Sequence, residues 1–120
     1  SLARFLGAVG RLSHARASAL SLPHVAAFNL PAVPQKYARV ARAMGYHVDS
    51  LPTLEAARQA VTGIRELCDD LGIPARLRDA GVSDERFDEM ATLCTQANYN
   101  RWNPRHTTTA EFLELFRKAY

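Results

Sequence analysis

Apolar residues recur at helical spacing along almost all of this 120-residue chain, and most of the repeating segments carry a residue that starts or stops a helix. One stripe begins at Pro34 and ends at Gly45, with apolar side chains at Tyr37, Val40, Ala41 and Met44. No stretch alternates apolar and polar residues for long enough to predict a strand. The sequence therefore predicts an all-α protein, a bundle of about six to seven helices.

A second helix is predicted from Thr53, with Glu55 in its first turn, where the positive end of the helix dipole favours an acid. The run Gly72-Ile73-Pro74 ends this helix, because Gly adopts the left-handed conformation and Pro cannot continue the helix. Its apolar stripe is expected to face the core and contains Leu54, Ala57, Val61, Ile64, Leu67, Cys68 and Leu71.

Two further helices have start signals. Ser83 is predicted to cap one, with Val82 and Phe87 at the spacing of a hydrophobic staple, and Thr108 and Glu111 form a capping box for the last. The expected buried faces are Phe87, Met90, Ala91 and Cys94 in the first, and Phe112, Leu115, Phe116 and Ala119 in the second. A short helix at Ala75–Ala80, ended by Gly81, is also expected.

The first thirty residues differ from the rest because their helical segments, Ser1–Val9 and Ser13–Asn29, are apolar almost all round. A helix without a polar face belongs at the centre of its bundle. No turn-forming residues precede the first helix, which starts at Ser1-Leu2-Ala3. We therefore expect residues 1–120 to be a single helical domain that is truncated at its N-terminus.

Composition narrows the class of protein further. With 48% apolar and 22% charged residues the chain is globular, and it has no run of 18 apolar residues to span a membrane and no signal peptide. The two cysteines, Cys68 and Cys94, are far apart and at apolar positions, which predicts reduced thiols and a cytoplasmic location. The net charge of +3 is spread among acids, so no nucleic-acid partner is expected.

Four histidines are the main candidates for chemistry. His14 and His24 are ten residues apart, so a helix places them about 80° from a common direction and they do not converge on one ion. His24 is expected to be a hydrogen-bonded core residue, and His47 and His106 are expected to be solvated in loops. No paired-cysteine or HExxH metal motif and no Gly-rich phosphate loop is present, so no cofactor-binding residue is predicted.

Several short motifs nevertheless occur together and in a fixed order. They are Leu6-Gly7 followed by His14, then Leu22-Pro23-His24-Val25, Phe28-Asn29, Leu71-Gly72-Ile73-Pro74, and Asn103-Pro104-Arg105 before the last helix. In this order, over essentially the whole chain, the sequence resembles the C-terminal helical domain of the iron-containing (group III) alcohol dehydrogenases. The resemblance implies the metal-side domain of a dehydroquinate synthase-like fold, without its α/β NAD(P) domain.

The family resemblance also implies a metal-dependent, NAD(P)-linked alcohol dehydrogenase or aldehyde reductase. Family members hold Fe²⁺, or Zn²⁺, with an Asp and three His, and His14 matches the last of these ligands. The other ligands and the nucleotide-binding domain would lie before Ser1. The chain alone is therefore expected to be inactive and to bind neither metal nor NAD(P) well, and its partners would be that missing domain and a small alcohol or aldehyde.

Three positions qualify the resemblance. Arg4 stands where the family has a further His near the nicotinamide, so no catalytic residue is assigned within the chain. Ala15 replaces the usual Gly after the last ligand, as in the maleylacetate reductase branch. Tyr99 and Trp102 lie in the segment with which the family lines its substrate pocket.

Because Arg4 departs from the family pattern, a second reading stays open. In that reading the chain is a non-catalytic, degenerate helical domain for interaction or dimerisation. Homo-oligomerisation is compatible with both readings, since nearly all-apolar helices can need a partner surface. The substrate, the metal, and the choice between NAD and NADP are left open by the sequence.

Overall fold

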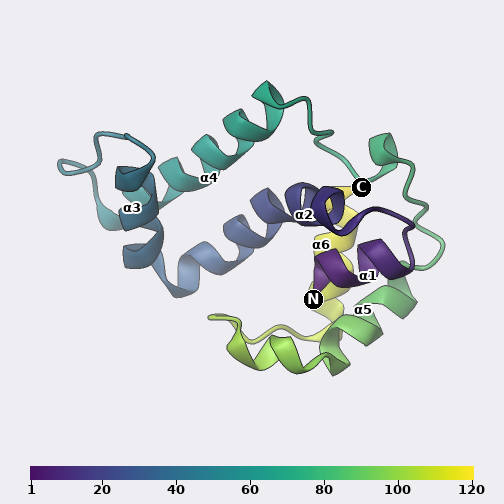
Figure 1. Cartoon of the computed structure of the whole chain (residues 1–120). Coiled ribbons are helices and arrows are strands. Elements are labelled where there is room, and N and C mark those ends of the chain that lie inside the picture. Colours follow the sequence, from purple (N-terminus) through teal and green to yellow (C-terminus); the bar gives the residue numbers. More distant parts are fainter.

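Helix α2 (His14–Asn29) is the element around which the others are arranged in this computed structural model, which describes residues 1–120 (Figure 1). It starts at the N-cap Ser13, whose Oγ accepts a hydrogen bond from the Arg16 backbone N–H at 3.3 Å, and it continues through Pro23. It contacts α1 (Leu2–Ala8), α4 (Thr53–Asp70) and α6 (Thr109–Ala119). The prediction that an almost wholly apolar helix lies at the centre is therefore confirmed.

The remaining elements complete an all-helical chain. They are the α-helices α3 (Pro34–Ala43) and α5 (Phe87–Gln96) and the 3₁₀ turns η1 (Leu30–Ala32), η2 (Arg78–Ala80) and η3 (Asn98–Trp102). Six α-helices and no strand confirm the predicted fold class. The molecule measures 44 × 31 × 19 Å, with α3 and α4 at one end and α1, α5 and α6 at the other (Figure 1).

None of these helices combines the length and the apolarity that crossing a membrane requires.

The largest of three buried clusters, here called the main core, lies between α1, the first half of α2, α5 and α6, and the two smaller clusters are described together below. The Phe87 and Phe116 rings stack with their centroids 5.4 Å apart. Both predicted faces, on α5 and on α6, are buried in it. The capping box is also confirmed, because Thr108 Oγ1 accepts from the Glu111 N–H at 3.3 Å and a Glu111 carboxylate oxygen accepts from the Thr108 N–H at 2.9 Å.

The second buried region, here called the alanine core, lies where α3 and α4 pack on the end of α2. Five of its eight buried residues are alanines: Ala26, Ala41, Ala56, Ala57 and Ala60. Helix α4 begins at Thr53 as predicted, and Gly72 just beyond its end has φ +66°. Gly63 faces Tyr46 so closely that a Cβ there would lie 2.7 Å from the Tyr46 ring.

The predicted apolar stripes of α3 and α4 are only partly correct. Ala57 and Val61 are buried, but the side chains of Leu54, Leu67 and Leu71 are exposed, Leu71 by 67%. Val40 on α3 and the C-cap residue Met44 are also exposed, whereas Ala41 is buried. The reason is that α3 and α4 approach each other closely along their small residues, which turns the large side chains outward.

The predicted start of α5 at Ser83 is wrong. Ser83 Oγ accepts from the Glu85 N–H at 3.3 Å and so stabilises a local turn, and the helix begins at Phe87. This side-chain bond competes with helix formation, as serine often does. Val82 and Phe87 are both buried in the main core, but they do not form the staple of a Ser83-capped helix.

The predicted helix at Ala75–Ala80 is reduced to the single turn η2. The backbone N–H of Leu77 donates to the Ala119 carbonyl at 2.7 Å, so this donor serves the end of α6 instead of a helix of its own. Gly81 ends the turn with φ +81°, as its position predicted. A tertiary hydrogen bond therefore replaces most of the expected local structure.

Candidate functional site

His14 is the first residue of α2, next to its N-cap Ser13. Its side chain is exposed and makes no hydrogen bond to the rest of the chain. It does not line the cavity described below. The imidazole is therefore free to accept an external partner, and nothing in the chain packs it away.

A metal centre needs more donors than His14 alone supplies. No three of the His, Cys, Asp and Glu side chains are grouped closely enough to hold an ion. Catalytic zinc and iron sites use three or more protein ligands. The donor set of these 120 residues fits one ligand of such a site and does not make the site itself.

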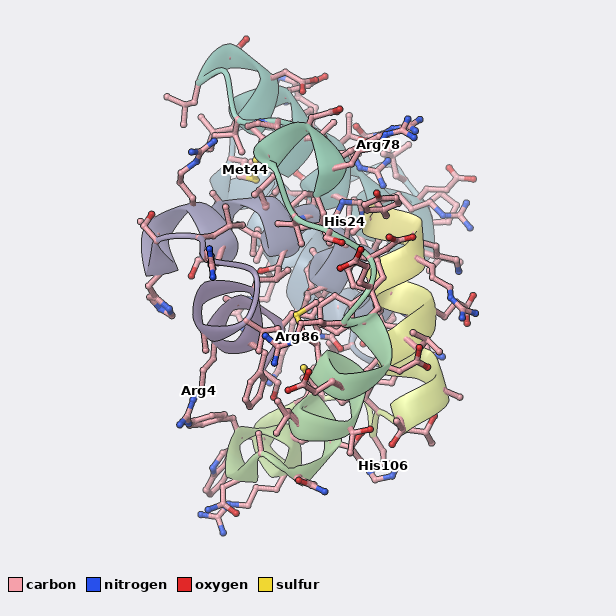
Figure 2. The ribbon with its side chains drawn as sticks, turned by 90° about the vertical axis from the view of Figure 1, so that its right-hand side faces the viewer. Arg4, His24, Met44, Arg78, Arg86 and His106 are labelled. Atoms are coloured by element: carbon pink, nitrogen blue, oxygen red, sulfur yellow. The ribbon has the colours of Figure 1, made fainter.

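His24 lies between α4 and α6, in the middle of the molecule (Figure 2). Burial lowers its pKa below the ordinary histidine value, a hydrogen bond with the Ala75 backbone acts in the opposite direction, and the positive charge of Arg65 lowers it further. The side chain is half-buried and lines the cavities on either side of it, so it is less enclosed than the core residue that the sequence predicted. His47 and His106 are exposed, which was expected.

A cavity of about 230 Å³ lies between the start of α1, the second half of α2, η3 and α6. Its walls are formed by Ser1, Leu2, Val25, Phe28, Tyr99, Asn100, Trp102, Asn103, Thr107, Phe112 and Leu115. Seven of these eleven residues are hydrophobic. A largely apolar cavity with a few polar groups is the usual form of a small-molecule site.

Tyr99 and Trp102, which the sequence analysis singled out, both line this cavity. Their side chains are 49% and 76% exposed, so they stand at its rim. Arg4 joins them from α1, because its guanidinium donates a hydrogen bond to Tyr99 Oη and lies 5.5 Å from the centre of the Tyr99 ring. In Figure 2, Arg4 extends outward at the edge of the molecule beside the segment that contains η3. The structure thus brings Tyr99 and Trp102 to one cavity and Arg4 to Tyr99, and His14 does not line this cavity.

The segment that follows η3 is fastened to α2 by contacts between two of the sequence motifs, Phe28-Asn29 and Asn103-Pro104-Arg105, and the sequence analysis did not predict these contacts. The amides of Asn29 and Asn103 form two reciprocal hydrogen bonds of 2.8 Å. The Arg105 guanidinium lies 3.8 Å from the centre of the Phe28 ring and donates to the Phe28 carbonyl and to Glu111, each at 3.0 Å. These contacts fix the wall of the cavity against the central helix.

Asn100 is a polar residue on the cavity wall. Its Nδ2 donates to the Thr107 carbonyl at 3.1 Å. Its Oδ1 is fully buried and has no hydrogen-bond partner in the protein. No sequence signal marks this residue, because its partner is the backbone carbonyl of a neighbouring loop.

The comparisons with known proteins agree over the entire chain. The sequence profile of the Fe-containing alcohol dehydrogenase family, C-terminal region, matches residues 1–120. The 1,3-propanediol dehydrogenase of Citrobacter freundii is 40% identical over 120 residues, and the lactaldehyde reductase of Escherichia coli (strain K12) is 35% identical over 119. The crystal structure of a 1,3-propanediol oxidoreductase superposes on 99% of the chain with a TM-score of 0.95 at 39% identity.

The fold, its all-helical order and this match make the chain a member of the iron-containing alcohol dehydrogenase family, of which it represents the C-terminal helical region. The resemblance that the sequence motifs indicated is therefore confirmed. The chain spans 31% of the length of the relatives named above, so those proteins contain a large N-terminal part that has no counterpart in these 120 residues.

Proposed function

We propose that residues 1–120 are the metal-side and substrate-side domain of an NAD(P)-dependent alcohol dehydrogenase or aldehyde reductase that uses a divalent metal ion. The observation that carries the proposal is the match of the complete chain to the C-terminal region of a family of such enzymes. The free imidazole of His14 at the start of α2 supports it.

In this proposal His14 contributes one ligand to Fe²⁺ or Zn²⁺, and a preceding domain contributes the others and binds NAD(P). Such an ion polarises the alcohol or carbonyl oxygen of the substrate and so favours hydride transfer to or from the nicotinamide. Within this chain, the hydrophobic residues of the cavity wall, with Tyr99 and Trp102 at its rim, contact the apolar part of the substrate. The chain alone, with one metal ligand and no nucleotide loop, has no activity of its own.

The narrower maleylacetate reductase reading rests on Ala15 and on 34% identity over 119 residues to the maleylacetate reductase of Pseudomonas aeruginosa, which is lower than the 40% identity to the 1,3-propanediol dehydrogenase. A cytoplasmic location belongs to the proposal, since Cys68 and Cys94 are both free thiols. Oligomerisation through the exposed apolar side chains of α4 is compatible with it.

The test uses the complete reading frame that contains this chain, expressed with Fe²⁺ or Zn²⁺ and assayed for NAD(P)-linked oxidation of small alcohols. His14→Ala is expected to lose bound metal and activity together, because a four-ligand shell lacking one member is incomplete. His47→Ala, at another exposed histidine, is the matched control and should retain both. Full metal content and activity in His14→Ala would contradict the proposal.

A non-catalytic interaction domain is the second candidate, and one observation favours it. Arg4 stands at a position where the family has a His, and its guanidinium donates a hydrogen bond to Tyr99 at the rim of the cavity. The same assay separates the two candidates. A metal-free, inactive complete protein that still associates with itself or with another chain would support the second.

A further inference from the structure

A second cavity, here called the basic cleft, lies between α2, the second half of α4, the loop that follows α4 and the last turn of α6. Its volume is about 390 Å³, within the range of about 300–1,000 Å³ that small-molecule sites occupy. His24, on the α2 side of the cleft, lies between α4 and α6 (Figure 2). None of the residues that line the basic cleft lines the cavity beside η3, so the two are separate features of the chain.

The charged side chains of the basic cleft are mostly cationic. Arg65, Arg76 and Lys118 line it, and Asp69 is the one acid that does so. Arg65 and Arg76 form no ion pair with any acid of the chain, whereas Lys118 Nζ lies 2.6 Å from a carboxylate oxygen of Glu114. The cleft therefore has two arginines whose charge is not neutralised within the chain. A concave surface with one prevailing sign of charge concentrates the potential that attracts an ion of the opposite sign.

The charge of Arg65 acts on other groups in the basic cleft. Burial lowers the pKa of His24, and the positive charge of Arg65 lowers that pKa further. The two side chains come from different helices, α2 and α4, and line the same cavity. Arg65 thus disfavours a second positive charge inside the cleft, and for the same reason it favours a negative one.

The number and the type of these cations favour a phosphate group as the anion. A phosphate monoester carries a charge of about −1.5 to −2 at pH 7 and has three acceptor oxygens. A guanidinium presents its N–H donors in a fork that matches phosphate oxygens. A carboxylate has one charge and two oxygens, so it would use fewer of the donors that Arg65, Arg76 and Lys118 supply.

The basic cleft also has an apolar wall, which favours an organic group attached to the phosphate. Leu20, Pro23 and Ile73 line the cleft together with the cations. A free phosphate ion would leave this wall in contact with water, whereas an attached organic group buries it and gains the free energy of that burial. The lining therefore favours an ester over the ion alone.

We propose that the basic cleft binds a small organic phosphate monoester, with the phosphate held by Arg65, Arg76 and Lys118 and the organic group against the apolar wall. This site is additional to the metal and substrate sites of the proposed function and does not depend on them. It gives a ligand to a face of the chain that the dehydrogenase proposal leaves without a role.

The experiment titrates the isotope-labelled 120-residue chain with phenyl phosphate, inorganic phosphate and phenol, followed by NMR. The ionic strength is held constant, and the pH is about 7.5, where the phosphate is mostly dianionic. Phenol and inorganic phosphate are the two halves of the ester, so the three probes separate their contributions. Phenyl phosphate is expected to shift the resonances of Leu20, His24 and Ala75 and to bind at least about 3-fold more tightly than either half.

Three variants each replace one exposed arginine by glutamine, and an unchanged amide spectrum shows that a variant has kept its fold. Arg65→Gln and Arg76→Gln should each weaken binding of phenyl phosphate by about 3- to 10-fold, because a charged hydrogen bond is lost at a site open to solvent. Arg117→Gln is the matched control, since Arg117 is the neighbour of Lys118 but does not line the cleft. The same loss of charge there should change the affinity by less than about 2-fold.

The absence of shifts at the basic cleft with phenyl phosphate would overturn the inference. An equal loss of affinity in Arg65→Gln and Arg117→Gln would also overturn it, because only the net charge of the chain would then attract the anion. Phenol that binds as tightly as phenyl phosphate would refute the role of the phosphate, and inorganic phosphate that does so would refute the ester. None of these readouts uses the metal or NAD(P), so the result is independent of the test of the proposed function.

Discussion

The main core and the alanine core bury different kinds of side chain, and they are built differently as a result. The main core joins helices from both ends of the sequence through large residues such as Phe87, Phe112 and Phe116. The alanine core joins α3 and α4, which are consecutive, through small residues that allow the helices to approach closely. Large residues fill the space between distant elements, whereas small residues set how closely neighbours can pack.

The difference extends to the candidate site. The cavity is bordered by Leu2, Phe112 and Leu115 of the main core and by η3, so its shape depends on the region with the larger buried side chains. Helix α4, which contributes to the alanine core, instead exposes large apolar side chains at Leu54, at Leu67 and at its C-cap Leu71. Mutations that affect each region separately test this comparison.

The largest effect is expected in the main core. Phe116→Ala should lower the free energy of unfolding by about 3–5 kcal/mol, because the side chain is completely buried and stacks on Phe87. Chemical denaturation followed by circular dichroism measures the loss. Leu71→Ala, at a side chain that is 67% exposed, should change the same quantity by less than about 0.5 kcal/mol. A loss below about 1 kcal/mol in Phe116→Ala would mean that the main core does not dominate stability.

A smaller effect is expected where the cavity wall is attached to α2. Arg105→Ala should lower the free energy of unfolding by about 2 kcal/mol, since it removes two hydrogen bonds and the contact with the Phe28 ring. It should also change the fluorescence of Trp102, the sole tryptophan of the chain. Arg117→Ala, an exposed arginine on α6, is the control. Unchanged fluorescence in Arg105→Ala would show that η3 is held by other contacts.

Next to the alanine core, a larger side chain at a closely packed position should lower the free energy of unfolding. Gly63→Ala should lower the free energy of unfolding by about 1 kcal/mol despite the better helix propensity of alanine, because its Cβ would lie 2.7 Å from the Tyr46 ring. A Cβ at Gly63 would also lie 2.8 Å from Met44 Cε, so in a Tyr46→Ser, Met44→Ala background the same substitution should become neutral or stabilising. The thermodynamic cycle formed by these variants, measured by urea denaturation, reads this coupling directly. Additive effects would rule out the close approach.

The smallest expected effect is the pH dependence of stability that arises from His24, the α2 residue that lies between α4 and α6. Because burial lowers the pKa of His24, the unfolded chain takes up the proton first as the pH falls below about 6.5. The free energy of unfolding should therefore fall as the pH drops below that value. Above it, His24 is neutral in both the folded and the unfolded chain, so it no longer makes the stability depend on pH. Urea denaturation at pH 7.5 and at pH 5.5 measures this change in the free energy of unfolding. Between the two pH values, the His24→Gln variant should lose less of it than the parent chain. An equal loss in both would assign the pH dependence to other groups.

The starts and ends of several helices could be predicted from the sequence because the capping and stop residues interact with backbone groups only a few positions away. The capping box of Thr108 and Glu111 and the stop at Gly72 were read correctly because both depend on neighbouring backbone groups. The predicted helix start at Ser83 was wrong because a serine side chain can stabilise a turn as well as a helix start. The predicted helix at Ala75–Ala80 was wrong because the Leu77 N–H donates to the Ala119 carbonyl, 42 residues away. A local sequence pattern contains no information about so distant a partner.

The candidate site was predictable only in part, for a related reason. Tyr99 and Trp102 were found through the resemblance to a family, and the structure places both on one cavity. The reciprocal pair of Asn29 and Asn103 joins residues 74 positions apart, and the free acceptor of Asn100 exists only because its amino group is already bonded. Periodicity likewise identified Leu67 and Leu71 as apolar but could not tell that they face outward.

The hydrogen bond from the Leu77 N–H to the Ala119 carbonyl has a consequence for the order in which the chain can fold during synthesis. The α3–α4 pair is complete once its own residues have left the ribosome, since its partners are close in sequence. The loop around Leu77 and helix α5 must wait for the final turn of α6. A chain that is stalled or terminated before α6 would thus contain a folded α3–α4 helical hairpin, while the hydrophobic residues of the main core stay exposed to solvent. Chaperones bind exposed hydrophobic segments of this kind.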